Sequence, residues 1–215
     1  MLKRAAIPGL LGATLLMAGC LQKDTVHTLY LSPDGAVKWT VDESSVYSDE
    51  ADEGKRVAED QAFIGPALIG THSTAQALQA LGADGLVRTT VVRDERPFHV
   101  ITDARFFRIE RAFEQLFKET GVKASVTLKA EGERSALNIR FDFSKEPEPR
   151  DGPVPAMLQD LDDLRFVLTE GRFVAGGGFD VPDRMRASLS REWLAAAEKV
   201  MEARGEMELT LSWIR

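Results

Sequence analysis

The chain has 215 residues, a single cysteine and a formal net charge of −7. A chain of this length is expected to form one domain, or two small ones, and to bury a core without disulfides or metal ions. One cysteine excludes an internal disulfide framework and any zinc site with four cysteines, and the acidic balance argues against nucleic acid as the main partner.

The first 19 residues have the three regions of a secretory signal peptide. Lys3 and Arg4 form a short basic region, residues 5–17 form an apolar region, and Ala18 and Gly19 are the small residues that a signal peptidase requires. An apolar run of 13 residues is too short to cross a bilayer as a helix. The sequence therefore predicts export with removal of residues 1–19.

The cysteine directly follows the two small residues. Met17-Ala18-Gly19-Cys20 resembles the lipobox of bacterial lipoproteins, in which leucine, a small residue, and glycine or alanine precede the cysteine. Methionine stands here where leucine is commonest. The resemblance implies that signal peptidase recognises Met17, Ala18 and Gly19, and that Cys20 carries diacylglycerol on its sulfur and becomes the first residue. The other interpretation is a plain secretory signal with an incidental cysteine.

Lipid on Cys20 predicts the membrane as the first partner. Two or more acyl chains hold a protein stably at a bilayer. Leu21 follows the cysteine, where enterobacterial lipoproteins kept in the inner membrane have aspartate. By that analogy we expect the outer membrane, with the protein facing the periplasm. Residues 20–26 are predicted to be a lipidated tether, at most about 25 Å long when fully extended.

Maturation makes the chain more acidic. Removing residues 1–19 takes away Lys3 and Arg4 and no acidic residue, which leaves 196 residues with 25 basic and 34 acidic side chains and a net charge of −9. Anionic lipid repels such a body. The lipid, and not the protein surface, is therefore expected to hold the chain at the membrane.

The mature chain repeats hairpins followed by helices. Turn residues at Ser32-Pro33-Asp34-Gly35 join the first two strands, and Gly65-Pro66 is predicted to kink or end the first helix. Thr71 or Ser73 is predicted to cap the second. The predicted strands are 27–31, 36–42, 86–93, 98–106, 124–130, 136–143, 164–169, 172–175 and 207–213, and the predicted helices are 53–64, 73–81, 108–120, 155–162 and one from 183 or 190 to 204.

Apolar and polar residues alternate within these strands, which favours antiparallel sheets with one buried face. The predicted class is α+β: a mainly antiparallel sheet of about seven to nine strands, built from successive hairpins, with helices packed on one face. Residues 27–215 are expected to form a single domain, and the proline-rich segment 145–155 is the candidate for an internal boundary. The layout loosely resembles small LppM-like envelope lipoproteins, without a shared catalytic motif.

The tryptophans Trp39, Trp193 and Trp213 are predicted to lie in the core, which would bring the two ends of the domain together. Motifs for chemistry are sparse, and neither HExxH nor GxSxG occurs. His27 and His99 fall on predicted strands and are expected to be half-buried or exposed. His72 lies beside two hydroxyl residues, which a helix start explains better than a nucleophile.

Two acidic clusters and a glycine run complete the candidates. Residues 49–53 and 160–163 lack the alternating oxygens and central glycine of a calcium loop, and 49–53 is expected to be a solvated loop that places negative charge at a helix start. The run Gly176-Gly177-Gly178 has no phosphate-binding motif around it and is expected to form a turn or a bulge. No metal or cofactor is indicated.

The sequence therefore predicts a membrane-anchored, periplasm-facing lipoprotein. Its expected role is non-catalytic, as a binding or envelope-assembly module for an envelope protein or an apolar, lipid-like ligand. The alternative hypothesis is a membrane-tethered hydrolase whose active-site residues are scattered in the sequence.

Overall fold

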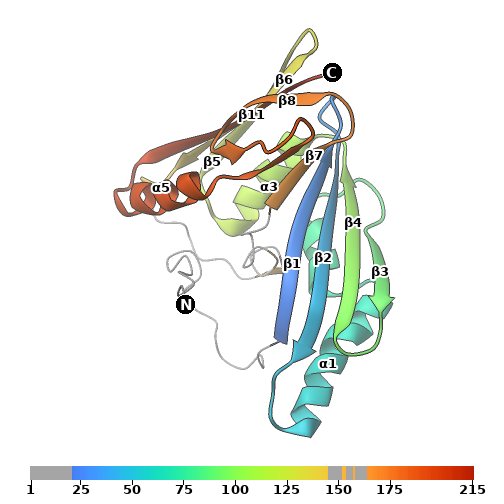
Figure 1. Cartoon of the computed structure of the whole chain (residues 1–215). Coiled ribbons are helices and arrows are strands. Elements are labelled where there is room, and N and C mark those ends of the chain that lie inside the picture. The colour runs from blue at the N-terminus through green and yellow to red at the C-terminus, as the bar shows by residue number, and fades with distance from the viewer. Residues whose placement is uncertain (1–20, 145–151, 154–156, 158–163) are drawn as a thin grey trace.

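The computed structural model describes residues 21–144, 152–153, 157 and 164–215. Within these residues, eleven strands and four helices form an α+β fold, which confirms the predicted class. Figure 1 shows a long curved sheet with helix α1 (Glu53–Leu68) at its lower end, and a second sheet with helix α5 (Arg191–Glu202) at the top.

The large sheet has the strand order β3-β4-β2-β1-β7-β10-β9. Its strands are β1 (Leu21–Leu31), β2 (Val37–Ser48), β3 (Arg88–Arg93), β4 (Phe98–Phe106), β7 (Leu164–Leu168), β9 (Phe179–Asp180) and β10 (Arg186–Leu189). Neighbours are antiparallel except β1 and β7, which run parallel. Burial alternates along β1, β2 and β4, so this sheet has a buried face and a second, open face.

Four strands form a separate small sheet in the order β5-β6-β11-β8. They are β5 (Ala124–Glu131), β6 (Arg134–Asp142), β8 (Arg172–Gly177) and β11 (Glu206–Ile214). The prediction of one sheet was wrong, because the strands divide into two layers. Helix α3 (Ile109–Thr120) lies between these layers and places aromatic side chains against both. Phe113 packs on Phe166 of β7, with ring centroids 6.4 Å apart, and Phe117 meets Phe141 of β6 edge-on at 5.4 Å.

Helix α1 continues through the proline that was expected to kink or end it. It begins after Asp52, whose carboxylate accepts the Lys55 N–H at 2.9 Å, so the acidic segment 49–53 does supply negative charge at a helix start. Pro66 lies in the last turn, where its missing N–H removes only one hydrogen bond. The helix closes when the Thr71 N–H donates to the Pro66 carbonyl at 2.8 Å.

The predicted boundaries of two later helices also change. Helix α2 (Ser73–Ala80) has His72 at its N-cap position, and neither Thr71 nor Ser73 makes the predicted side-chain cap. The Thr71 hydroxyl donates instead to a carbonyl of α1. Helix α5 begins near the later of its two predicted starts, because residues 186–189 pair as strand β10.

The main hydrophobic core includes buried residues of both sheets and of α2 and α3. Trp39 of β2 and Trp213 of β11 lie in it, as predicted, and the Trp213 indole N–H donates to the Pro33 carbonyl at 3.3 Å. This bond joins the last strand to the first hairpin. Trp193 is only half-buried and packs on the edge of this core. The predicted helix 155–162 falls almost wholly outside the described residues.

Candidate functional site

The predicted lipidation and processing residues Met17, Ala18, Gly19 and Cys20 lie outside the described residues. The structure does describe the segment that follows them. Strand β1 begins at Leu21, which pairs with Ser48, so residues 21–26 are part of the large sheet and not the tether that was predicted.

The sequence concealed this extension because the first inward-facing side chains of β1 are polar. Lys23 and Thr25 point the same way as Leu29 and Leu31, but hydrophobic alternation detects only the later pair. Lys23 finds an interior partner in the Glu43 carboxylate, whereas the buried Thr25 hydroxyl has no hydrogen-bond partner among the described residues.

The lower end of the large sheet is held by side chains from three elements. The Ser48 N–H donates to the Asp60 carboxylate of α1 at 2.9 Å. The Arg96 guanidinium donates to the Ser48 carbonyl and lies 5.2 Å from the centre of the Tyr47 ring. Leu21 packs on a small separate core formed by α1, β2 and β4. Side-chain contacts therefore hold the end of the sheet at which strand β1 begins.

A buried polar cluster lies between the large sheet and α2. Its centre is Glu43 of β2, which is 1% exposed. The Lys23 Nζ lies 2.8 Å from Oε1, and the Thr74 hydroxyl donates to Oε2 at 2.8 Å. His72 Nε2 lies 3.5 Å from Oε2 and 3.0 Å from the Thr102 hydroxyl. Groups from β1 and from the start of α2 thus meet at one carboxylate of β2, and Thr102 of β4 joins the cluster through His72.

The partners of Glu43 decide its charge. Burial alone would raise the pKa of the Glu43 carboxyl, but hydrogen bonding to His72, the positive charge and hydrogen bond of Lys23, and the Thr74 hydroxyl lower the pKa to about 2. The carboxylate is therefore ionised at neutral pH. Thr102 and His72 are also buried, so no substrate reaches these atoms in this conformation. The arrangement can stabilise the fold, and it does not present a nucleophile to solvent.

His27 belongs to the same interior and was predicted to be half-buried or exposed. It is fully buried, because it shares the inward face of β1 with Leu29. The Trp39 indole N–H donates to His27 Nδ1 at 3.2 Å. Burial lowers the pKa of His27 to about 4, against the smaller raising effects of Glu43 and of the Met157 backbone. The ring is therefore neutral at neutral pH.

The titration of His27 predicts a loss of stability in mild acid. Because its folded pKa of about 4 lies below the unfolded value of 6.5, the unfolded state binds more protons between these values. This contribution, on the order of 3 kcal/mol, is complete above pH 6.5 and is lost as the pH falls to about 4. Urea unfolding between pH 7 and 4 measures the slope. We expect His27→Gln to flatten this slope. A slope in His27→Gln equal to that of the wild type would contradict the proposed titration of His27.

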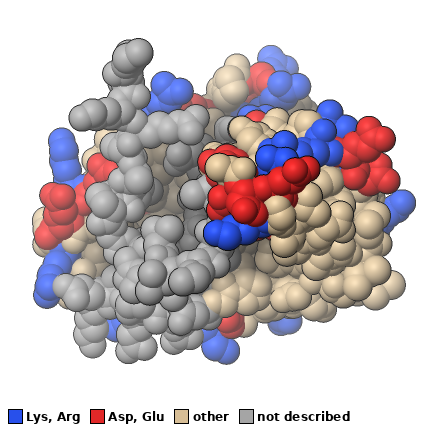
Figure 2. Space-filling view, turned by 90° about the horizontal axis from the view of Figure 1, so that it is seen from below, with Lys and Arg blue, Asp and Glu red and all other residues tan. Residues whose placement is uncertain are grey.

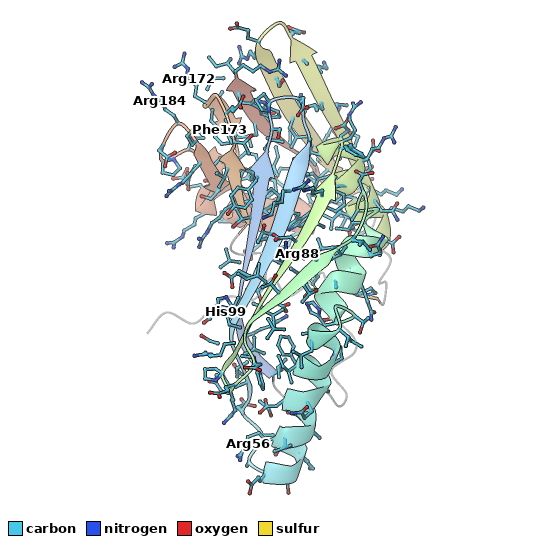
Figure 3. All side chains as sticks on the ribbon, turned by 90° about the vertical axis from the view of Figure 1, so that its right-hand side faces the viewer. Arg56, Arg88, His99, Arg172, Phe173 and Arg184 are labelled. Atoms are coloured by element: carbon cyan, nitrogen blue, oxygen red, sulfur yellow. The ribbon has the colours of Figure 1, made fainter. Side chains whose placement is uncertain are left out.

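His99 lies on the open face of the large sheet (Figure 3). Its Nε2 lies 2.8 Å from the Asp42 carboxylate, and of the described residues only Asp42 hydrogen-bonds to this ring. Further along the same face, Asp103 accepts hydrogen bonds from Thr40 at 2.7 Å and pairs with Lys38 at 3.1 Å. The open face is thus polar and internally paired.

A shallow depression of about 620 Å³ lies on this face where β1, β7 and β10 meet. Tyr30, Val167 and Pro182 contribute apolar surface to it, and Arg165 and Arg186 contribute charge. Arg186 also pairs with Asp183 at 3.6 Å. The lining of this depression is therefore mixed, unlike the apolar groove that would favour a lipid-like ligand.

The remaining sequence candidates have structural roles or lie outside the described chain. Residues 160–163 are not described, and no group of three metal-ligating side chains occurs among the residues that are. Gly176 and Gly177 end β8, and Gly178 forms the expected irregular turn with φ of 83°. A β-carbon at Gly178 would lie 2.5 Å from Trp193, so glycine is required there by close packing.

No protein-family model matches the chain, and no curated protein matches it in sequence. One solved structure, the folded domain of Mycobacterium tuberculosis LppM determined by NMR, is similar with a TM-score of 0.39 and 11% sequence identity. The alignment covers 94% of this chain and 95% of that domain. A similarity at this level does not assign a function to the chain.

Within the described residues, no helix has both the length and the apolar character needed to span a membrane.

Proposed function

We propose that this chain is a bacterial envelope lipoprotein, attached to the membrane through lipid on Cys20, whose folded body binds a partner without catalysis. The start of β1 at Leu21 carries this proposal. A strand that begins one residue after the anchor leaves no flexible spacer, so the lower end of the large sheet would rest at the bilayer surface. The outer membrane, facing the periplasm, is the expected location because Leu21 and not aspartate follows the cysteine.

The surface near this end favours attachment by lipid over attachment by charge. Figure 2 views the molecule from this side and shows acidic residues gathered with a few basic ones. Exposed residues of the segment that starts α1 include Asp49, Asp52 and Glu53. Anionic headgroups would repel these carboxylates. Membrane attachment through Cys20 should therefore persist in high salt, which releases proteins held by basic patches.

The open face of the large sheet favours binding as the role of the body. It presents a depression with aromatic, aliphatic and arginine side chains, whereas His27 and His72 are closed inside the protein. The mixed lining suits a protein surface better than an apolar molecule. The histidine that does reach this face, His99, pairs with Asp42 and with no hydroxyl among the described residues, which gives the hydrolase hypothesis no nucleophile there.

Replacing Cys20 with serine tests the anchor. Cys20→Ser is expected to abolish labelling by radioactive palmitate and to leave the chain unprocessed or soluble, because serine offers no sulfur for diacylglycerol. Met17→Leu is the matched control, since it brings the motif closer to the lipobox pattern and should keep both labelling and fractionation. Density-gradient separation of the membranes then measures which one holds the wild type. Labelling of Cys20→Ser equal to that of the wild type would overturn lipidation.

A further inference from the structure

Strand β3 is an edge of the large sheet, and its outer side is unpaired in the described chain. It hydrogen-bonds to β4 on one side only. Every second residue of an edge strand directs its N–H and C=O groups away from its neighbour, and this leaves a template for another strand. Figure 3 looks from the side of the molecule on which β3 lies, with α1 beside the strand.

Large apolar side chains are exposed along this edge. Ile69 is 75% exposed at the end of α1, and a β-carbon placed on the next residue, Gly70, would lie 3.8 Å from Thr89 of β3. Leu68 and Val92 are also more than half exposed. The edge strand of the small sheet is a useful contrast, because no large apolar residue of β5 is exposed. Exposed apolar surface of this kind is typical of interaction sites.

The two ends of β3 carry positive charge. Arg88 and Arg93 are exposed, and neither forms an ion pair with a described residue. Asp103 lies opposite Arg88 in β4, but its carboxylate pairs with Lys38, and Arg105 is also exposed at this end of β3. A strand added here would gain from a carboxylate near Arg88. These exposed positive charges are notable because the mature chain is expected to carry a net charge of −9.

A second copy of this chain fits the edge poorly if both copies are anchored in one membrane. The pairs Leu21–Ser48, Val46–Phe98 and Arg93–His99 place the Arg93 end of β3 at the same end of the sheet as Leu21. Antiparallel pairing of two β3 strands requires a two-fold axis perpendicular to them, which puts the two Leu21 ends at opposite ends. With the strands upright on the bilayer, one anchor would then be lifted away from the membrane.

We propose that β3 accepts an extended segment of another envelope protein as an added strand, with a carboxylate opposite Arg88 and apolar side chains against Ile69 and Val92. Backbone hydrogen bonds supply most of the affinity in this mode of recognition, and side chains supply the choice of partner. The exclusion of a second copy rests on the proposed function, because it requires the anchor at Cys20. The strand edge and its apolar border do not depend on the lipid.

A model strand peptide tests this on the full-length, detergent-solubilised protein. The probe is a capped peptide of about eight residues, alternating valine and threonine, with glutamate at both ends. We expect bound peptide to slow amide hydrogen exchange in β3 by about tenfold and to leave β5, the matched edge of the small sheet, unchanged. Arg88→Glu and Ile69→Lys, both at exposed positions, should each weaken binding by about tenfold. The same peptide with lysine in place of glutamate should bind more weakly still.

Three outcomes would overturn the proposal: no protection of β3, equal protection of β3 and β5, or a dimer of the wild type in which β3 itself is protected without peptide. The Cys20→Ser variant separates this proposal from the proposed function. Peptide binding that survives in Cys20→Ser supports the strand site whatever the anchor does. Normal palmitate labelling in a protein whose β3 never becomes protected would refute the strand site and leave the lipoprotein proposal standing.

Discussion

Phe113→Ala is expected to lower the free energy of unfolding by about 3–5 kcal/mol, the usual loss for removing a large aromatic side chain from a packed core. Phe113 is 4% exposed and lies on α3 between the two sheets. Its ring packs on Trp39 and Phe166 of the large sheet, with centroids 6.2 and 6.4 Å away, and on Phe117 at 6.1 Å. Phe117 in turn contacts the small sheet, so alanine would leave a cavity where the layers join.

Phe107→Ala is the matched control for this prediction. Phe107 precedes the same helix but is 74% exposed. Because its removal opens no cavity, the expected change in the free energy of unfolding is within about 0.5 kcal/mol. Urea denaturation followed by tryptophan fluorescence measures both variants. Equal losses in Phe107→Ala and Phe113→Ala would show that α3 does not join the two layers as described.

Glu43→Gln is expected to cost about 3 kcal/mol at pH 7, near the lower end of the range for breaking a buried ion pair. Glutamine cannot balance the Lys23 charge, and it leaves Thr74 and His72 with a neutral partner. The Lys23 side chain is 24% exposed, so water recovers part of the loss. Thermal unfolding under reversible conditions or urea denaturation gives the difference.

The pH dependence of this effect has a defined sign. Since the pKa of Glu43 falls from 4.5 to about 2 on folding, the wild type holds its advantage above pH 4.5 and loses it as the pH falls toward 2. Asp42→Asn is the control, because Asp42 is the next residue but pairs with His99 on the open face. We expect that change to cost less than about 1 kcal/mol. Equal costs for Asp42→Asn and Glu43→Gln would contradict the buried network.

Local patterns were sufficient for much of the fold. The turn Ser32-Pro33-Asp34-Gly35 joins β1 and β2 as predicted, and the amphipathic stripe and closing Gly121 placed α3 closely. The predicted helix end at residue 64 was wrong, because Pro66 lies in the last turn, where its missing N–H removes only one hydrogen bond, and the helix runs on to Leu68. The division into two sheets was missed because strand pairing depends on contacts between distant residues.

The candidate sites divide in the same way. The lipobox pattern at Cys20 is a local signal, and it remains a prediction. The cluster around Glu43 gave no signal, because nothing near Glu43 in the sequence indicates that Lys23, His72 and Thr74 will meet it. Only the burial of His27 could have been inferred from the sequence, because its spacing from Leu29 and Leu31 places all three on one face of a strand.

By itself, the sequence determined the α+β class and most of the helices and strands, and it predicts an export and lipidation signal in residues 1–20. These features depend on neighbours along the chain, through periodicity, turns and short motifs. Only the tertiary structure decided that the fold begins at Leu21, that the sheet is split in two and that β3 is left as an open edge. Each of these depends on strand register and layer packing, which arise from contacts between residues far apart in the chain.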